Sequence, residues 1–221
     1  MLRQIANAWR ILFMSGRGAK RPPNPDDLTL KQRARWDRIV HAALHLLEHN
    51  AYEQIQIREV ADAAQVALGT VYRYFASKDV LITEWVRGIV AHKEEDWKDL
   101  NAKHRGDPEG QLQEWSRRIA AKLRAMEERG SALGNAFAEL PDPNHPARRV
   151  MKEHKLRTHK RVVRLCKAAG FPDPAFSANL FTMMLEGAHS CGTCVGMRQI
   201  GEHLVQVVDR MVENNRRQRA G

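Results

Sequence analysis

The sequence predicts an all-α protein on three observations. Apolar residues recur at three- and four-residue spacing, no segment alternates apolar and polar residues as a strand would, and breaks rich in Gly and Pro separate the periodic segments. Those breaks include GDPEG (106–110), Gly130, PDPNHP (141–146), GFPDP (170–174) and Gly201. Helices are therefore expected near residues 29–49, 57–64, 68–75, 78–104, 111–129, 131–139, 146–169, 174–198 and 201–217. The T-x-x-Q pattern of Thr29 and Gln32 is a capping box that predicts where the first helix begins.

The composition is that of an ordinary globular protein, with 43% hydrophobic and 28% charged residues. The net charge of +10 suggests a polyanionic partner, although residues 29–93 contribute only +2 of it. The 3 cysteines cannot form a disulfide framework, so a reducing cytoplasm is expected. No apolar run approaches the roughly 20 residues that cross a bilayer, and no signal peptide is expected. The sequence therefore predicts no membrane partner.

Two short helical segments within residues 57–75 form a recognisable pattern. Residues 57–64 and 68–75 are separated by only three residues, and Ser77 is a suitable N-cap for the long helix that follows. Two short helices joined by a tight turn predict a helix-turn-helix, whose second helix enters the major groove of DNA. Gly69 permits close approach of the backbone. Side chains suited to phosphates or base edges are Thr70, Tyr72, Arg73, Tyr74 and Lys78.

The segment AYEQIQIREVADAAQVALGTVYRYFASKDVL, residues 51–81, resembles the TetR family of bacterial regulators, and the resemblance extends over about residues 35–84. It implies a three-helix DNA-binding domain over residues 29–93 and a larger helical ligand-binding and dimerisation domain over residues 94–221. The family usually has Thr where Gln56 stands, Gly where Gln65 stands and Ser where Ala67 stands. An Ala at this N-cap position costs about 0.5–2 kcal/mol relative to Ser. The DNA-contact roles of the family fall on Arg58, Leu68, Thr70, Tyr72, Tyr74 and Lys78.

Some positions near this motif have two interpretations. Phe75 is expected in the core, whereas Tyr72 fits either the core or a phosphate contact, and Arg73 either faces phosphate or reads a base. Residues 1–28 predict a disordered basic arm, which is either a solvated tail or enters a minor groove through Arg17, Lys20 and Arg21. Met14 is an alternative to Met1 as the native start.

The last two predicted helices have the features of a dimer surface. Small residues between 187 and 196 allow helix backbones to approach closely, and one stripe of the last helix is apolar. A homodimer would place two recognition helices in successive major grooves about 34–36 Å apart. Ordinary packing within one chain is the alternative. The predicted interface residues are Gly192, Gly196, Leu204, Val208 and Met211.

A pocket for a small hydrophobic or amphipathic effector is expected in the C-terminal domain, lined by Trp97, Trp115, Met126, Phe137, Phe181, Met183 and Met184, although each also suits a plain core. Residues 147–167 have a net charge of +8. They form either a solvated helix face or an attractive surface for an anionic effector or for DNA outside the operator. Cys191 and Cys194, with His189 nearby, lack a full set of zinc ligands, so buried small residues are expected there rather than a metal or redox site.

Together these patterns predict a ligand-responsive transcriptional regulator, a repressor released from a palindromic operator when an effector shifts the helix at 78–104. Two alternatives are a general DNA-coating protein without an effector and an enzyme on a helical scaffold. The enzyme is supported only by the 10 histidines and the C-x-x-C. No nucleophile–base pairing, glycine-rich phosphate loop or metal spacing is present, so no catalytic residue, metal or cofactor is predicted.

Overall fold

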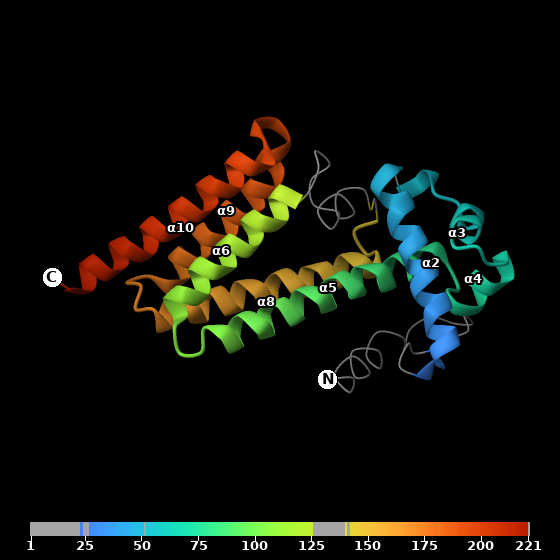
Figure 1. Cartoon of the computed structure of the whole chain (residues 1–221), viewed down its shortest axis with the longest axis horizontal. Helices are drawn as coiled ribbons and strands as arrows, with labels where there is room; N and C mark the ends of the chain where they lie inside the picture. The colour runs from blue at the N-terminus through green and yellow to red at the C-terminus, as the bar shows by residue number, and fades with distance from the viewer. Residues whose placement is uncertain (1–22, 24–26, 51, 126–139, 141, 221) are drawn as a thin grey trace. The chain divides into compact units, whose positions relative to one another are not determined.

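A computed structural model describes residues 23, 27–50, 52–125, 140 and 142–220, and all regular structure within them is helical (Figure 1). The predicted all-α fold is confirmed. The helix expected at 131–139 lies outside the described residues. In the described part of the chain, no helix has the length and apolar character needed to span a membrane. The elements are α2 (Leu30–His49), the 3-10 turn η2 (Tyr52–Gln54), α3 (Ile57–Ala63), α4 (Leu68–Tyr74), α5 (Lys78–Lys103), α6 (Pro108–Ala125), α8 (Pro146–Ala168), α9 (Pro174–Val195) and α10 (Met197–Ala220).

The chain divides into two compact units, and α5 and α8 each contribute residues to both. The first unit comprises residues 1–88 and 139–147, and the second comprises residues 89–138 and 148–221. The divisions fall within α5, after Gly88, and within α8, after Ala147. The first unit therefore contains α2, α3, α4 and the starts of α5 and α8, while the second contains the rest of these two helices together with α6, α9 and α10.

The core of the first unit is built on α2. This helix begins at the predicted capping box, in which the Thr29 amide donates to Gln32 Oε1 at 2.9 Å. Trp36, Ile39 and Ala43 are buried at helical spacing on one face. The Trp36 ring lies 4.3 Å from the Phe75 ring, centroid to centroid. This confirms the core position predicted for Phe75 and fixes the end of α4 against α2.

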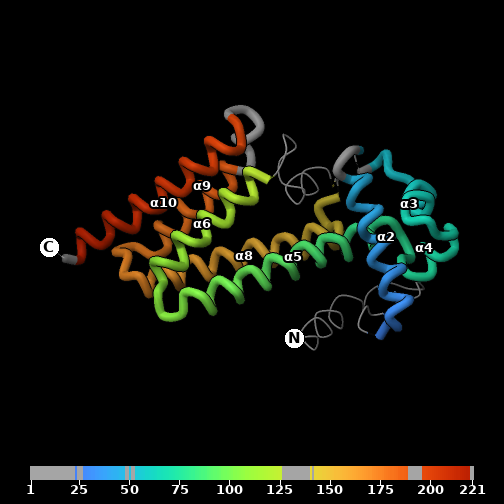
Figure 2. The backbone as a smooth tube through the Cα atoms, viewed as in Figure 1, coloured from blue at the N-terminus to red at the C-terminus, as the bar shows by residue number. Residues whose placement is uncertain are grey.

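The core of the second unit lies between α6, α8, α9 and α10. Figure 2 shows α10 running alongside α6 and α9. Fully buried apolar side chains come from each of these helices, and each contributes roughly 1.5–3 kcal/mol of hydrophobic stabilisation. Examples are Leu112, Val162, Phe181 and Val208.

Two helices start three or more residues away from the predicted position. The first is α6, which begins at Pro108 and not near residue 111. Asp107 Oδ1 accepts a hydrogen bond from the Gly110 amide at 2.8 Å, as an N-cap residue does. Proline is well suited to the first helical position, because the missing N–H has no partner there. GDPEG is thus a helix start and not only a break.

The second difference concerns Gly201, which was expected to begin a new helix. The break lies at Gly196 instead, whose φ is 102°, and α10 begins at Met197. Gly201 is inside α10, where an added Cβ would lie 3.2 Å from three atoms of Ala120, including the backbone oxygen. The glycine is therefore needed for the close approach of α10 to α6.

Candidate functional site

The turn between α3 and α4 has the tight geometry of a helix-turn-helix. The Val66 amide donates to the Ala61 carbonyl at 3.0 Å, and the Gln65 amide donates to the Asp62 carbonyl at 3.0 Å. Gln65 has a φ of 53°, in the left-handed region that glycine adopts without steric cost. An exposed glutamine therefore makes the turn in a conformation that L-residues adopt rarely.

The first turn of α4 has no side-chain cap. Ala67 is the N-cap residue, with extended backbone angles, and its methyl group cannot accept a hydrogen bond. The Thr70 amide instead donates to the Ala67 carbonyl at 2.7 Å. The predicted N-cap position of Ala67 is thus confirmed. Gln56 is the N-cap residue of α3, and its amide donates to Glu59 Oε2 at 2.9 Å.

One face of α4 is buried and the other is open to solvent. Val71 packs into the core of the first unit, whereas Gly69 and Arg73 are exposed. Tyr72 is 52% exposed and its ring projects outward, so it does not belong to the core. Thr70 is half-buried at the border between the two faces.

Tyr74 lies on the buried face, although it was predicted to contact phosphate. It is only 4% exposed, and its ring packs edge-on against Trp36 at a centroid distance of 6.1 Å. The reason is helical spacing, since Tyr74 follows Val71 by three residues and shares its face. The Tyr74 ring is therefore a core element, and Tyr72 is the tyrosine of α4 whose ring projects into solvent.

The remaining predicted DNA contacts flank the exposed face of α4. Ser77 caps α5 as predicted, its hydroxyl accepting from the Val80 amide at 3.2 Å. The next residue, Lys78, is half-buried and its ammonium donates to the Ile55 carbonyl at 3.3 Å. Arg58 is exposed on the first turn of α3, while Leu68 packs partly against the core. The exposed surface is thus formed by the start of α3, by α4 and by the start of α5.

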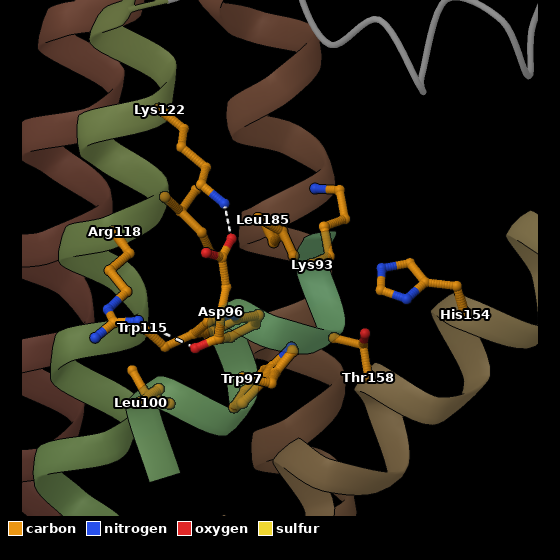
Figure 3. Close-up of a pocket in the computed structure, with 11 residues that line it drawn as sticks. Lys93, Asp96, Trp97, Leu100, Trp115, Arg118, Lys122, His154, Thr158 and Leu185 are labelled. Carbon is orange, nitrogen blue, oxygen red and sulfur yellow. Dashed lines mark hydrogen bonds and ion pairs between the residues drawn. The ribbon is translucent and has the colours of Figure 1, made fainter. Parts of the chain in front are cut away.

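A second candidate site is a cavity of about 100 Å³ in the second unit (Figure 3). Trp97 on α5 and Trp115 on α6, two of the residues proposed for the effector pocket, line it with their ring centroids 5.4 Å apart at 33°. The other lining residues are Lys93, Asp96, Leu100, Arg118, Ile119, Lys122, His154, Thr158 and Leu185. Aromatic and charged groups therefore line the same small space.

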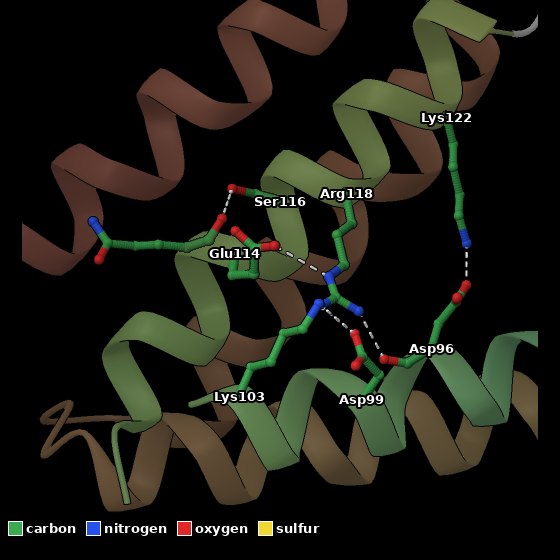
Figure 4. Close-up of polar contacts among 8 residues, drawn as sticks. Asp96, Asp99, Lys103, Glu114, Ser116, Arg118 and Lys122 are labelled. Carbon is green, nitrogen blue, oxygen red and sulfur yellow. Dashed lines mark hydrogen bonds and ion pairs between the residues drawn. The ribbon is translucent and has the colours of Figure 1, made fainter. Parts of the chain in front are cut away.

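Most cations of this cavity are already paired with carboxylates (Figure 4). Arg118 donates to Asp99 Oδ2 at 2.8 Å and to Glu114 Oε1 at 3.2 Å. Lys122 forms an ion pair with Asp96. These contacts join α5 to α6 and leave both basic groups without excess charge.

Lys93 and His154 differ from these paired cations. Burial and the neighbouring Lys122 ammonium lower the pKa of Lys93 below its usual value. Burial, followed by the Lys93 ammonium, lowers the pKa of His154 to about 4. His154 is therefore neutral at pH 7, and its Nδ1 lies 3.5 Å from Glu94 Oε1.

The other predicted pocket residues lie elsewhere. Phe181 is fully buried in the helical core, edge-on to Phe171, and Met184 packs partly against the same core. Neither lines the described cavity. Met183 is exposed, and Met126 and Phe137 lie outside the described residues.

The polar lining of the cavity was not predicted from the sequence. Lys93 precedes Trp97 by four residues, and Thr158 follows His154 by four residues. Residues four apart share a helix face. The spacing from Trp97 was thus a usable signal for Lys93, whereas nothing in the sequence pairs α5 with α8.

The predicted dimer surface is partly occupied by packing within the chain. Leu204 and Val208 are buried in the core of the second unit, and Met211 packs partly against it. The burial of these side chains agrees with the alternative expectation, that the stripe of the last helix packs within its own chain. Gly196 is exposed, whereas the burial of Gly192 and the side chains of His189, Cys191 and Cys194 are not among the described features.

The basic segment at 147–167 forms most of α8, and several of its cations have carboxylate partners. Arg161 forms an ion pair with Glu94, Arg157 lies 3.6 Å from the same carboxylate, and Lys155 lies 2.8 Å from Glu186. The Arg161 guanidinium also lies 5.6 Å from the Trp97 ring centroid. Part of the positive charge of α8 is therefore neutralised inside the second unit.

Comparison with known protein families finds one match over the helix-turn-helix. Residues 39–84 match a family model described as bacterial regulatory proteins, tetR family. The matched range covers the end of α2, all of α3 and α4, and the first turns of α5.

Curated relatives are similar over the same part of the chain. The HTH-type transcriptional repressor KstR of Rhodococcus jostii (strain RHA1) is 50% identical over 54 residues, 24% of this chain and 26% of the relative. The fatty acid metabolism regulator protein of Bacillus subtilis (strain 168) is 36% identical over 73 residues, 31% of this chain and 38% of the relative. The alignments thus span about a quarter to two fifths of the length of these relatives.

Solved structures are similar over most of the chain. A TetR-family transcriptional regulator from Streptomyces coelicolor aligns with a TM-score of 0.75 and 24% identity, covering 82% of this chain and 95% of that structure. The fatty acid degradation regulator FadR from Bacillus halodurans aligns with a TM-score of 0.65 and 18% identity, covering 79% and 94%. At these identities the likeness shows a shared fold, which includes the helical C-terminal half.

Proposed function

We propose that this chain, which belongs to the TetR family of bacterial transcriptional regulators, is a cytoplasmic repressor that binds a palindromic operator as a homodimer and is released by a small hydrophobic or amphipathic effector. The family is one of DNA-binding regulators, so an enzymatic role is set aside. The observation that best supports operator binding is the exposed face of α4, which combines an unobstructed Gly69 with the outward ring of Tyr72. A general DNA-coating role is the alternative that an operator assay must exclude.

The exposed surface of the first unit fits the requirements of the major groove. An α-helix fits the groove, and contacts to phosphate position it while contacts to base edges determine sequence preference. Tyr72 and Lys78 have groups suited to phosphate, whereas Thr70 and Arg73 are candidates for bases. Lys78 also lies at the N-terminus of α5, where the helix dipole favours an anion.

Apolar side chains on α9 and α10 remain available for a partner subunit. Phe176 and Met183 are seven residues apart on α9 and are 59% and 63% exposed, and Val207 on α10 is 40% exposed. Because exposed apolar groups of this size favour association, we place the homodimer surface on these residues and not on the buried Leu204 and Val208. A Met183→Glu variant should shift the protein from dimer to monomer in analytical ultracentrifugation, whereas an unchanged dimer would contradict this placement.

Operator binding is tested with DNA from the region upstream of the gene for this chain. A gel-shift and footprinting experiment should show one or two protected palindromic sites and a steep fall of affinity with salt. Equal affinity for that DNA and for random DNA of the same length would overturn the repressor proposal.

Gly69 offers a variant that separates DNA contact from folding. A Cβ at this position would meet nothing in the protein within 4 Å, so Gly69→Ala should preserve or raise stability, by up to about 1 kcal/mol. If the backbone of α4 approaches DNA closely, the same methyl group should lower operator affinity by about tenfold or more.

Gly88→Ala is the matched control, because Gly88 lies in α5 and also has no neighbour within 4 Å of an added Cβ. Its operator affinity should equal that of the wild type. Full affinity in Gly69→Ala would show that α4 does not approach DNA at this point.

A further inference from the structure

The cavity in the second unit contains one ammonium group that differs from its neighbours. Lys93 lies in the middle of α5 and is largely shielded from solvent. The Asp96 and Glu186 carboxylates act on its ammonium electrostatically, but no carboxylate among the described residues lies within ion-pair distance of it. Asp96, the carboxylate of the lining, forms its ion pair with Lys122. A shielded cation without a partner is unfavourable, and the natural way to satisfy it is an anion.

A second unsatisfied polar group lines the same cavity. The Thr158 hydroxyl is buried and has no hydrogen-bond partner among the described atoms. Figure 3 shows Thr158, His154 and Lys93 on one side of the cavity, opposite the pair formed by Lys122 and Asp96. A buried hydroxyl left unpaired is unfavourable, so a ligand oxygen that accepts from Thr158 would be stabilised there.

The charges that face Lys93 favour an anionic ligand. The Lys122 ammonium disfavours further positive charge beside Lys93, and His154 is neutral. The surrounding carboxylates already have cationic partners, since Asp96 pairs with Lys122, Asp99 with Arg118 and Glu94 with Arg161. Asp96 and Glu186 raise the pKa of Lys93 by less than burial and Lys122 lower it, and Glu186 is paired with Lys155. A second cation at this place would therefore be repelled, and a neutral ligand would leave the Lys93 charge unsatisfied.

The rest of the lining determines what can be attached to the anionic group. Trp97 and Trp115 present aromatic surface, and Leu100 and Ile119 add apolar surface. A cavity of about 100 Å³ is small beside the roughly 300–1,000 Å³ of pockets that enclose drug-sized molecules. The space therefore suits a compact apolar body.

We infer that the effector of this protein is an organic monocarboxylate, with its carboxylate bound by the Lys93 ammonium and the Thr158 hydroxyl and its compact apolar body against Trp97 and Trp115. The identification of this ligand as an effector rests on the proposed function, whereas its binding does not. The basic α8 helix takes part through Thr158 and not through its arginines.

Two matched pairs of probes test the inference on the full-length protein. Phenylacetate is compared with phenylacetamide, and hexanoate with hexanamide, by isothermal titration calorimetry. Each pair has the same apolar body and differs in the negative charge. At least one acid should bind with a millimolar or tighter dissociation constant and about tenfold more tightly than its amide.

Substitutions then test whether Lys93 and Thr158 cause the preference for the acid over the amide. Lys93→Met keeps the apolar stem and should abolish the preference for the acid, and Thr158→Val should weaken acid binding by about fivefold. Lys98→Met is the control, since Lys98 is an exposed lysine on the same helix and pairs with Glu95. Removing a shielded charge should not destabilise the protein, so thermal unfolding of Lys93→Met will show that lost binding is not lost folding.

The outcomes separate this inference from the proposed function. Equal affinity for acid and amide, an undiminished preference in Lys93→Met, or no binding of all four probes would overturn the inference. These results leave operator binding untouched, because gel shifts measure it without a ligand. Acid-selective binding by a protein that shows no operator preference would instead support the cavity assignment and reject the repressor.

Discussion

The left-handed backbone conformation of Gln65 is expected to lower the stability of the helix-turn-helix. Replacing Gln65 by glycine removes the Cβ that crowds the backbone at a φ of 53°. The side chain is exposed, so its removal sacrifices little packing. We therefore expect Gln65→Gly to stabilise the first unit.

The magnitude follows from two opposing effects. An L-residue in the left-handed region costs roughly 1–2 kcal/mol. Glycine loses more freedom on folding, which costs roughly 0.5–1 kcal/mol. The expected net gain is about 1 kcal/mol, which shifts the urea midpoint by about 0.5 M for an m-value of about 2 kcal/mol per M.

Urea unfolding followed by far-UV circular dichroism measures this gain, and Gln65→Ala is the matched control. Alanine removes the same side-chain atoms beyond Cβ but keeps the strain, so its midpoint should stay near that of the wild type. A gain of the same size in both variants would show that the glutamine side chain, and not its φ, is unfavourable. No gain in Gln65→Gly would refute the strain argument.

Three further predictions concern other features of the fold. Ala67→Ser should add the missing cap of α4 and raise the free energy of unfolding by about 1 kcal/mol, and an unchanged urea midpoint would contradict the N-cap assignment. Gly201→Ala should cost about 1–3 kcal/mol in urea unfolding, because the backbone of Ala120 cannot move aside, while Gly187→Ala, with open space around it, should cost nothing. Since the pKa of His154 is lowered to about 4, the unfolded chain takes up its proton first as the pH falls, and stability should decline between about pH 6.5 and 4 by on the order of 3 kcal/mol. His154→Gln should flatten that part of a stability profile against pH, and the same decline in the variant would assign it to other groups.

The sequence predicted the helices and the DNA-binding motif well because both depend on local patterns. The capping residues Thr29 and Ser77 and the N-cap position of Ala67 were predictable, since each lies within a few residues of its hydrogen-bond partner. The start of α6 was misplaced because proline and glycine favour both turns and helix starts. Local signals of this kind locate elements but can leave their ends ambiguous.

Features that depend on which helices meet were not predictable. Tyr74 has a hydroxyl suited to phosphate, and only the packing of α4 on Trp36 shows that its ring is buried. Lys93 and Thr158 come from helices about 65 residues apart in the sequence, and no pattern in either one identifies the other. Leu204 and Val208 have the spacing of an interface and equally that of a core, and burial alone separates these possibilities.

A single uninterrupted helix contains both Lys78, beside the proposed DNA surface, and Lys93, in the proposed acid site. The two lysines are separated by 15 residues of this helix. If occupancy of the acid site lowers operator affinity by some factor, thermodynamic linkage requires operator DNA to lower acid affinity by the same factor. The acid affinity measured on free protein would then overstate the affinity of the DNA-bound repressor, and the concentration of acid needed for release would depend on how much operator is present.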